Sequence, residues 1–108
     1  MIASGLILAR LGDVPDPGAI VTDAGGVSLI LTRRGGAVRA FINRCTHADY
    51  PLQRADGRVL VQEGRYLVCG AHGASYTLDD GACAGGPCNG KDLSQVAIAL
   101  RDGVIITA

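Results

Sequence analysis

Alternation of apolar and polar residues is the main pattern along this chain, and it predicts β-strands. In residues 37–43, every second residue from Val38 to Ile42 is apolar. Residues 95–100 and 103–107 show a similar alternation and predict a closing hairpin. A period of two is typical of strands, because successive side chains of an extended chain point to opposite faces of a sheet.

Shorter β-prone segments complete the predicted secondary structure. They are residues 6–11, 19–22, 27–32, 58–62, 65–68 and 75–78. Residues 27–32 carry apolar side chains on both faces, so we expect both sides of this strand to be partly covered. No segment shows a convincing period of 3.6 residues, and the chain is therefore predicted to be all-β.

Glycine-containing turns separate the predicted strands. The chain has 16 glycines, and turns are predicted at Gly25-Gly26, Arg34 to Gly36, Glu63-Gly64 and Asp79 to Gly81. Glycine suits such turns because it adopts a positive φ without steric penalty. The glycine-rich residues 81–90 are expected to contain no regular structure. The strands are expected to form a small β-sandwich.

Composition indicates one globular domain over residues 1–108. Apolar residues make up 48% of the chain, which argues against disorder, and ten basic residues balance ten acidic ones. Nothing suggests the clustered basic face of a nucleic-acid-binding protein. No run approaches the roughly 18 apolar residues of a membrane helix, and the apolar first residues lack the basic start of a signal peptide. We therefore expect a cytoplasmic protein that contacts neither nucleic acid nor membrane.

Two short motifs bring together the residues that can bind a metal. Cys45 and His47 form the first pair, and Cys69 and His72 form the second. The chain contains only two histidines, and each lies within three residues of a cysteine. Each pair follows a predicted strand, so both are expected on loops at one tip of the sandwich. Thiolates and imidazoles are ligands for zinc and for iron–sulfur clusters.

Spacing alone leaves several interpretations of these four residues. A structural zinc ion accepts two Cys and two His, although zinc sites usually separate paired ligands by two to four residues, and only one residue separates Cys45 from His47. Mononuclear non-haem iron fits less well, because no carboxylate completes a facial triad. Coincidental placement would require both paired spacings to arise by chance.

Two stretches of the chain resemble the cluster loops of Rieske [2Fe–2S] proteins, and the resemblance covers almost the whole chain. The matching positions are Ala40, Phe41, Asn43 to His47 and Leu52 around the first loop, and Leu67 to Gly73, Tyr76, Gly86 and Pro87 around the second. The resemblance implies a Rieske-like small β-sandwich with a two-loop cluster-binding tip.

The resemblance also implies the ligand set of one [2Fe–2S] cluster per chain. Cys45 and Cys69 correspond to the thiolate ligands of one iron, and His47 and His72 to the imidazole ligands of the other. Pro87 corresponds to a residue of the loop that covers the cluster.

Positions near the implied cluster point to the low-potential, ferredoxin-type branch of the family. Quinol-oxidising members join the two loops by a disulfide, but Tyr50 and Ala71 stand in those places. They also use a serine hydroxyl where this chain has Ala74. Hydrogen bonds to cluster sulfur raise the reduction potential, so these losses lower it. We interpret Tyr76 as a packing aromatic; the alternative is that its hydroxyl reaches a cysteine sulfur.

Cys83 and Cys88 remain outside the implied ligand set. We favour two thiols packed near Pro87, because a cytosolic setting disfavours disulfides. A disulfide and a metal role are the alternatives.

The resemblance implies a one-electron carrier rather than an enzyme. It would pass electrons from a ferredoxin reductase to a terminal oxygenase or a similar acceptor, as a monomer. One alternative is a small Rieske subunit of a larger redox enzyme, as in nitrite reductases. The other is a zinc-stapled binding module.

Overall fold

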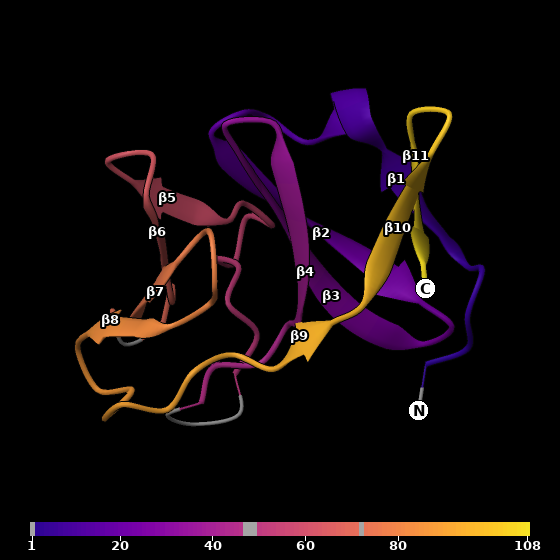
Figure 1. The fold of residues 1–108 in the computed structure, drawn as a ribbon. Helices are drawn as coiled ribbons and strands as arrows, with labels where there is room; N and C mark the ends of the chain where they lie inside the picture. Colours follow the sequence, from indigo (N-terminus) through magenta and orange to yellow (C-terminus); the bar gives the residue numbers. More distant parts are fainter. Residues whose placement is uncertain (1, 47–49, 72) are drawn as a thin grey trace.

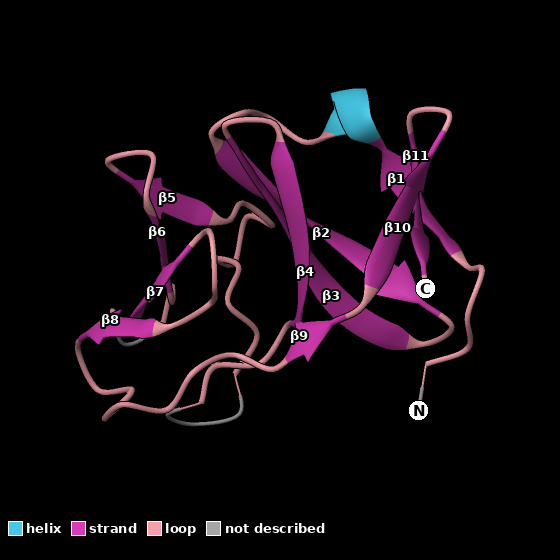
Figure 2. Ribbon diagram, in the orientation of Figure 1, coloured by secondary structure: helices cyan, strands magenta, loops and turns pink. Residues whose placement is uncertain are grey.

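The computed structural model of the chain describes residues 2–46, 50–71 and 73–108. Within these residues the strands form three antiparallel sheets (Figures 1 and 2). The base sheet has the order β1 (Ile7–Arg10), β11 (Val104–Thr107) and β10 (Ile98–Arg101). The central sheet has the order β2 (Gly18–Ala24), β3 (Val27–Arg34), β4 (Ala37–Ile42) and β9 (Gln95–Val96). The distal sheet has the order β5 (Leu60–Gln62), β6 (Tyr66–Val68), β7 (Ser75–Thr77) and β8 (Cys83–Gly85).

The all-β prediction is confirmed. The helical structure in the described residues is a single 3-10 turn, η1 (Leu11–Asp13). No helix in the described part of the chain is long and apolar enough to cross a membrane.

The central sheet contributes to two separate hydrophobic cores. Leu29 and Leu31 of β3 pack with Leu8 and Ile105 of the base sheet. Ile30 points to the opposite face and belongs to the core formed with the distal sheet. Because burying such a side chain contributes about 1.5–3 kcal/mol, both layers depend on β3. The prediction that both faces of residues 27–32 are covered is therefore confirmed.

Two glycine turns set the register of the central sheet. Gly25 and Gly26 join β2 to β3, and Gly35 and Gly36 join β3 to β4. All four residues have positive φ, between 58° and 92°, as two-residue hairpin turns of this kind require. The resulting register pairs Ile30 with Phe41, which places the two side chains on the same face.

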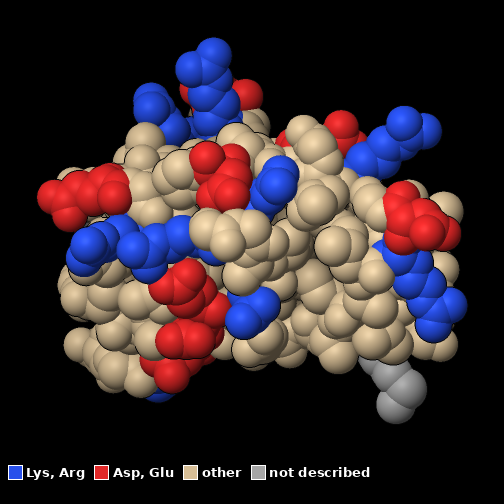
Figure 3. Space-filling model, turned by 45° about the horizontal axis from the view of Figure 1, so that its top comes forward, with Lys and Arg blue, Asp and Glu red and all other residues tan. Residues whose placement is uncertain are grey.

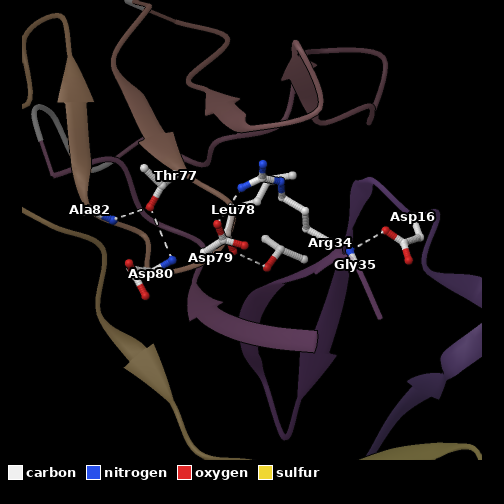
Figure 4. Close-up of polar contacts among 9 residues, drawn as sticks. Asp16, Arg34, Gly35, Thr77, Leu78, Asp79, Asp80 and Ala82 are labelled. Carbon is white, nitrogen blue, oxygen red and sulfur yellow. Dashed lines mark hydrogen bonds and ion pairs between the residues drawn. The ribbon is translucent and has the colours of Figure 1, made fainter. Parts of the chain in front are cut away.

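Polar contacts fasten the turn that follows β7 to the central hairpin of β3 and β4 (Figure 4). The buried hydroxyl of Thr32 donates to the carbonyl oxygen of Leu78 over 2.7 Å. Arg34 forms an ion pair with Asp79, also over 2.7 Å. The ion pair is partly exposed and contributes little, so the buried Thr32 hydrogen bond carries more of this attachment.

The chain enters and leaves the distal part of the fold at almost the same point. The backbone amide of Ile42, the last residue of β4, donates to the carbonyl oxygen of Ser94 over 2.8 Å. β9 follows at once and pairs with β4. Residues 43–94 therefore form one continuous excursion from the central sheet, visible at the left and bottom of Figure 1.

Two secondary-structure predictions are wrong in detail. Residues 81–90 include a strand, β8, in which Cys83 pairs with Tyr76 and Gly85 pairs with Ser75. Residues 95–100 do not form one strand, since they divide at Ala97 into β9 and β10. In both cases the partner strand decides the structure, because β8 completes the distal sheet while β9 and β10 pair in different sheets.

Cys83 and Cys88 form a disulfide, so the expectation of two thiols is wrong. The residues are five positions apart, and their Cα atoms lie 6.0 Å apart. The chain turns back after β8 at Gly86, which has a positive φ of 77°. This reversal brings Cys88 to Cys83, and no metal role is needed to explain either residue.

Candidate metal centre

Cys45 lies on the loop that follows β4. The amide of Arg44 donates to the carbonyl oxygen of Ile42 over 2.8 Å, which bends the chain at the end of the strand. The amide of Cys45 then donates to the carbonyl oxygen of Tyr50 over 2.7 Å. The Cys45 side chain is completely buried, so the loop holds its sulfur inside the fold.

Asn43 fixes the first loop through three hydrogen bonds. Its Nδ2 donates to Ser28 Oγ over 3.0 Å and to Gln53 Oε1 over 2.7 Å. Its Oδ1 accepts from the backbone amide of Leu52 over 2.7 Å. Asn43 therefore holds together the start and the end of the loop that carries Cys45. Asn43 was among the positions given for the family resemblance, but its role follows only from these partners.

Cys69 lies one residue beyond the end of β6. Its amide donates to the carbonyl oxygen of Ala74 over 2.8 Å, and its carbonyl accepts from the amide of Gly73 over 3.0 Å. The amide of Gly70 donates to the carbonyl oxygen of Leu52 over 3.1 Å, which joins this loop to the first one. Cys69 is 1% exposed.

The two cysteines belong to the same hydrophobic core and fit a soft-metal centre. Cys45 and Cys69 both pack in the cluster of buried residues that includes Leu52 and Leu67, and neither takes part in a disulfide. Buried thiols of this kind suit a thiolate-bound iron–sulfur cluster. His47 and His72, the other expected ligands, lie outside the described residues.

Tyr76 combines both roles that the sequence left open. Its ring is completely buried in the core shared by the two cysteines. Its hydroxyl lies 3.5 Å from Cys45 Sγ, 2.8 Å from Thr46 Oγ1 and 3.1 Å from the backbone nitrogen of Thr46. Burial raises the pKa of the Tyr76 hydroxyl above its ordinary value, so the neutral, proton-bearing form is favoured. The interpretation of Tyr76 as a packing residue alone is therefore incomplete.

A third loop, around Gly86 and Pro87, packs against the loop of Cys69. A Cβ atom added to Gly86 would lie 2.8 Å from the carbonyl oxygen of Gly73 and 3.0 Å from the Cα of Ala74. Glycine is therefore needed for this close approach as well as for the positive φ. Pro87, expected near the cluster, is half-buried, and the disulfide to Cys88 closes the loop.

An open groove of about 270 Å³ lies between the first and second loops. It is lined by Tyr50, Pro51, Gln53, Arg54, Ala55, Gly70 and Ala71. Tyr50 is 53% exposed, which makes it one of the most exposed large apolar side chains among the described residues. No sequence pattern placed Arg54 in this groove, because its position depends on how the two loops meet.

Known structures share this fold over nearly the full chain. The ferredoxin of carbazole 1,9a-dioxygenase from Nocardioides aromaticivorans IC177 matches with a TM-score of 0.78 and 20% identity, covering 95% of each chain. The Sphingomonas yanoikuyae B1 ferredoxin matches with a TM-score of 0.76 and 25% identity, covering 94% of this chain and 95% of that one. The terminal oxygenase of carbazole 1,9a-dioxygenase from Novosphingobium sp. KA1 matches with a TM-score of 0.77 and 19% identity, but this match covers 28% of the oxygenase.

A family comparison agrees with these structural matches and with the buried cysteine pair. Residues 6–101 match the model of the Rieske [2Fe-2S] domain. This match includes both cysteine loops and every strand except β11. It implies one [2Fe–2S] cluster in the chain. The family match therefore favours the cluster over the structural zinc ion that the spacing of the ligands left open. The chain belongs to the Rieske [2Fe–2S] domain family.

Proposed function

We propose that this chain is a one-electron carrier that receives an electron from a ferredoxin reductase and passes it to a terminal oxygenase or a similar acceptor. The observation that carries the proposal is the burial of Cys45 and Cys69 on two loops that are joined to each other beside an open, partly apolar groove. The protein thereby keeps the two proposed thiolate ligands away from solvent, and we propose the nearby groove as the surface on which a partner docks.

We further propose that Cys45 and Cys69 hold one iron of the cluster, and that His47 and His72 hold the other. Such a cluster supplies reversible uptake of one electron at a potential between about −150 and +300 mV. The chain's own residues fix where this happens. Asn43 holds the first loop in place, the amide of Gly70 joins the second loop to the first, and Gly86 brings the third loop close.

The surface around the groove suits brief docking rather than a permanent interface. Tyr50 and Pro51 are exposed beside Arg54, so the rim is apolar with a charge at its edge. On the face shown in Figure 3, which is the top of the molecule as drawn in Figure 1, basic side chains lie among acidic ones, and a run of adjoining acidic side chains is visible at the lower left. With a net charge of zero, long-range steering is weak, and electron transfer is expected to depend only modestly on salt.

The terminal oxygenase is proposed as acceptor because the same fold occurs in both parts of one enzyme system. The ferredoxin and the terminal oxygenase of carbazole 1,9a-dioxygenases each match this chain. The chain spans 95% of that ferredoxin but 28% of that oxygenase, which supports a carrier rather than an oxygenase. No observation favours the alternative of a nitrite-reductase-like subunit.

A kinetic experiment tests the proposal directly. The cluster-loaded protein is reduced by a ferredoxin reductase and then mixed rapidly with a Rieske-type terminal oxygenase, while its visible absorbance is followed. Single-exponential reoxidation with a stoichiometry of one electron per chain is expected. A colourless protein, or a reduced protein that no oxygenase reoxidises faster than buffer does, would contradict the proposal. The Tyr50→Ser variant, with its cluster spectrum unchanged, is expected to react more slowly.

A further inference from the structure

The disulfide between Cys83 and Cys88 closes the third loop into a small ring. Cys83 belongs to β8, where it pairs with Tyr76 of β7, whereas Cys88 follows the loop. The ring contains Gly86, where the chain turns back with a positive φ. The disulfide therefore fixes the end of the third loop to β8, the edge strand of the distal sheet.

Gly86 lies against the backbone that closes the loop of Cys69. A Cβ atom on Gly86 would come within 2.8 Å of the carbonyl oxygen of Gly73 and 3.0 Å of the Cα of Ala74. The amide of Gly73 donates to the carbonyl of Cys69 over 3.0 Å, and the carbonyl of Ala74 accepts from the amide of Cys69 over 2.8 Å. The third loop thus rests on the two residues that hold Cys69 in place.

The disulfide is the strongest link that keeps the third loop in this position. In the described part of the chain, no backbone hydrogen bond joins residues 86–88 to the loop of Cys69. On one side of the third loop, the amide of Cys83 donates to Asp92 Oδ1 over 2.9 Å. On the other side, the Thr46 hydroxyl donates to the carbonyl oxygen of the residue before Asp92 over 3.0 Å. Both bonds are exposed to water, so each contributes little to the position of the loop.

The two linked cysteines differ in their access to solvent. Cys83 is partly exposed, but Cys88 is 1% exposed. Thiol–disulfide exchange begins when a thiolate attacks one of the two sulfur atoms, and access decides which one. A reductant in solution therefore attacks Cys83, and Cys88 is the leaving group. The carbonyl oxygen of Gly85 lies 3.2 Å from Cys88 Sγ and offers a hydrogen-bond acceptor to the thiol that is released.

We propose that the Cys83–Cys88 disulfide is a thiol-exchange site for a dithiol reductant, and that its opening shortens the lifetime of the cluster. The inference rests on the proposed role of Cys69 as a cluster ligand. Opening the ring frees Gly85 and Gly86, and glycine regains more backbone conformations than any other residue. The third loop then leaves the loop of Cys69, and local opening gives water and chelators access to the centre.

The exchange balances with the dithiol as its only co-reactant. The first thiolate of the reductant forms a bond to Cys83 Sγ, the bond to Cys88 breaks, and Cys88 leaves as a thiolate that takes up a proton. The second thiolate of the reductant then attacks the reductant's sulfur in the mixed disulfide and releases Cys83 as a thiol. The protein disulfide gains two electrons and two protons, and the dithiol is oxidised to a disulfide.

Alkylation tests whether the disulfide is an exchange site. The cluster-loaded protein is treated with dithiothreitol without oxygen and then with iodoacetamide, and mass spectrometry of its peptides identifies the modified cysteines. Cys83 and Cys88 are expected to be modified without denaturant, whereas Cys45 and Cys69 are expected to stay unmodified while the colour persists. A disulfide that resists dithiothreitol in the folded protein would overturn the proposal.

Iron release to a chelator measures the effect on the centre. The reduced protein is expected to release iron about five- to thirtyfold faster than the disulfide form, where the upper value is the chain-entropy limit for so small a ring. Reoxidation of the thiols is expected to restore the slow rate. Replacement of both Cys83 and Cys88 by alanine gives the matched control, which is expected to release iron fast with or without dithiothreitol. Equal rates in the two wild-type forms would overturn the proposal, as would an equal acceleration of the control by dithiothreitol.

Hydrogen–deuterium exchange gives a readout that does not depend on iron release or on the alanine variant. Peptides that cover residues 73–75 and 84–91 are expected to exchange faster in the reduced wild-type protein, whereas β3 is expected to exchange at the same rate in both forms. Unchanged exchange in the third loop would contradict its release. A colourless protein contradicts the proposed function itself, whereas a coloured protein with equal iron release in both forms contradicts only the role of the disulfide.

Discussion

The backbone amide of Gly70 donates a hydrogen bond to the carbonyl oxygen of Leu52, and this 3.1 Å contact joins the two loops that carry the buried cysteines. Leu52 in turn donates its own amide to Asn43 Oδ1. Both loops are thus linked to one asparagine through the backbone of Leu52. These hydrogen bonds between protein groups contribute to the geometry around the two cysteines.

Asn43→Ala is expected to destabilise the fold by about 3 kcal/mol, because it removes three hydrogen bonds and leaves the buried amide of Leu52 without its acceptor. Denaturant unfolding measures the change. Asn43→Asp keeps the acceptor for Leu52 but loses the two donors, so it is expected to fall between the wild type and Asn43→Ala. Equal stability of Asn43→Ala and the wild type would show that the asparagine does not organise the loop.

Cys45→Ser and Cys69→Ser are each expected to abolish the visible absorbance of the cluster. Both side chains are buried, and each variant removes a thiolate from the proposed ligand set. Because metal binding is coupled to folding, these variants are also expected to be less stable. Iron content and the visible spectrum measure the effect, and a full complement of iron in either variant contradicts the assignment.

Replacing both Cys83 and Cys88 by alanine is expected to leave the cluster spectrum intact, which makes it the matched control for the ligand variants. The disulfide closes a short ring, since its residues are five positions apart. Chain-entropy arguments for a ring of this size give a loss of about 2 kcal/mol in the free energy of unfolding. Disappearance of the brown colour would place one of these cysteines in the ligand set instead.

Gly86→Ala is expected to destabilise the protein by about 1–3 kcal/mol and to speed loss of the cluster. The new methyl group meets the carbonyl of Gly73 at 2.8 Å, and the residue must keep a φ of 77°. Gly85→Ala is a close control, because its added Cβ has no neighbour within 4 Å and its φ is not positive. Iron release to a chelator, followed in both variants, measures the difference; similar rates would mean that the third loop does not protect the centre.

Sequence patterns predicted the elements whose determinants are local. The hairpins at Gly25-Gly26 and Gly35-Gly36 could be recognised because turn residues and alternating strands are neighbours in the chain. β8 could not, since its residues become a strand only by pairing with Ser75 and Tyr76. The β9–β10 division at Ala97 has a similar cause, because the two short strands pair in different sheets.

The cysteines of the candidate centre could be predicted, because their residue type and spacing identify them in the sequence. The paired motifs indicated Cys45 and Cys69, and the structure places both in one core. The partners of Asn43 could not be found, because Ser28 lies 15 residues before it and Gln53 ten residues after it. The contact between Thr46 and Lys91 spans 45 residues and was likewise invisible in the sequence. The disulfide depended on a chain reversal that composition does not specify.

The 2.8 Å hydrogen bond from Ile42 to Ser94 has a consequence for how this architecture can be modified. Residues 43–94 leave the central sheet at the end of β4 and return to it at β9, and these two strands pair with each other. In the connectivity of the sheet, the excursion therefore stands in the place of one long hairpin loop. The register of the central sheet is set by the turns at Gly25-Gly26 and Gly35-Gly36, so changes in the exposed turns of the excursion leave it in place as long as the apolar side chains packed against Ile30 are kept. Residues 43–94, which carry both cysteine loops, can therefore be regarded as a transferable segment. Another β-sandwich could accept this segment between two paired antiparallel strands, if it also offers an apolar sheet face for the distal sheet to cover.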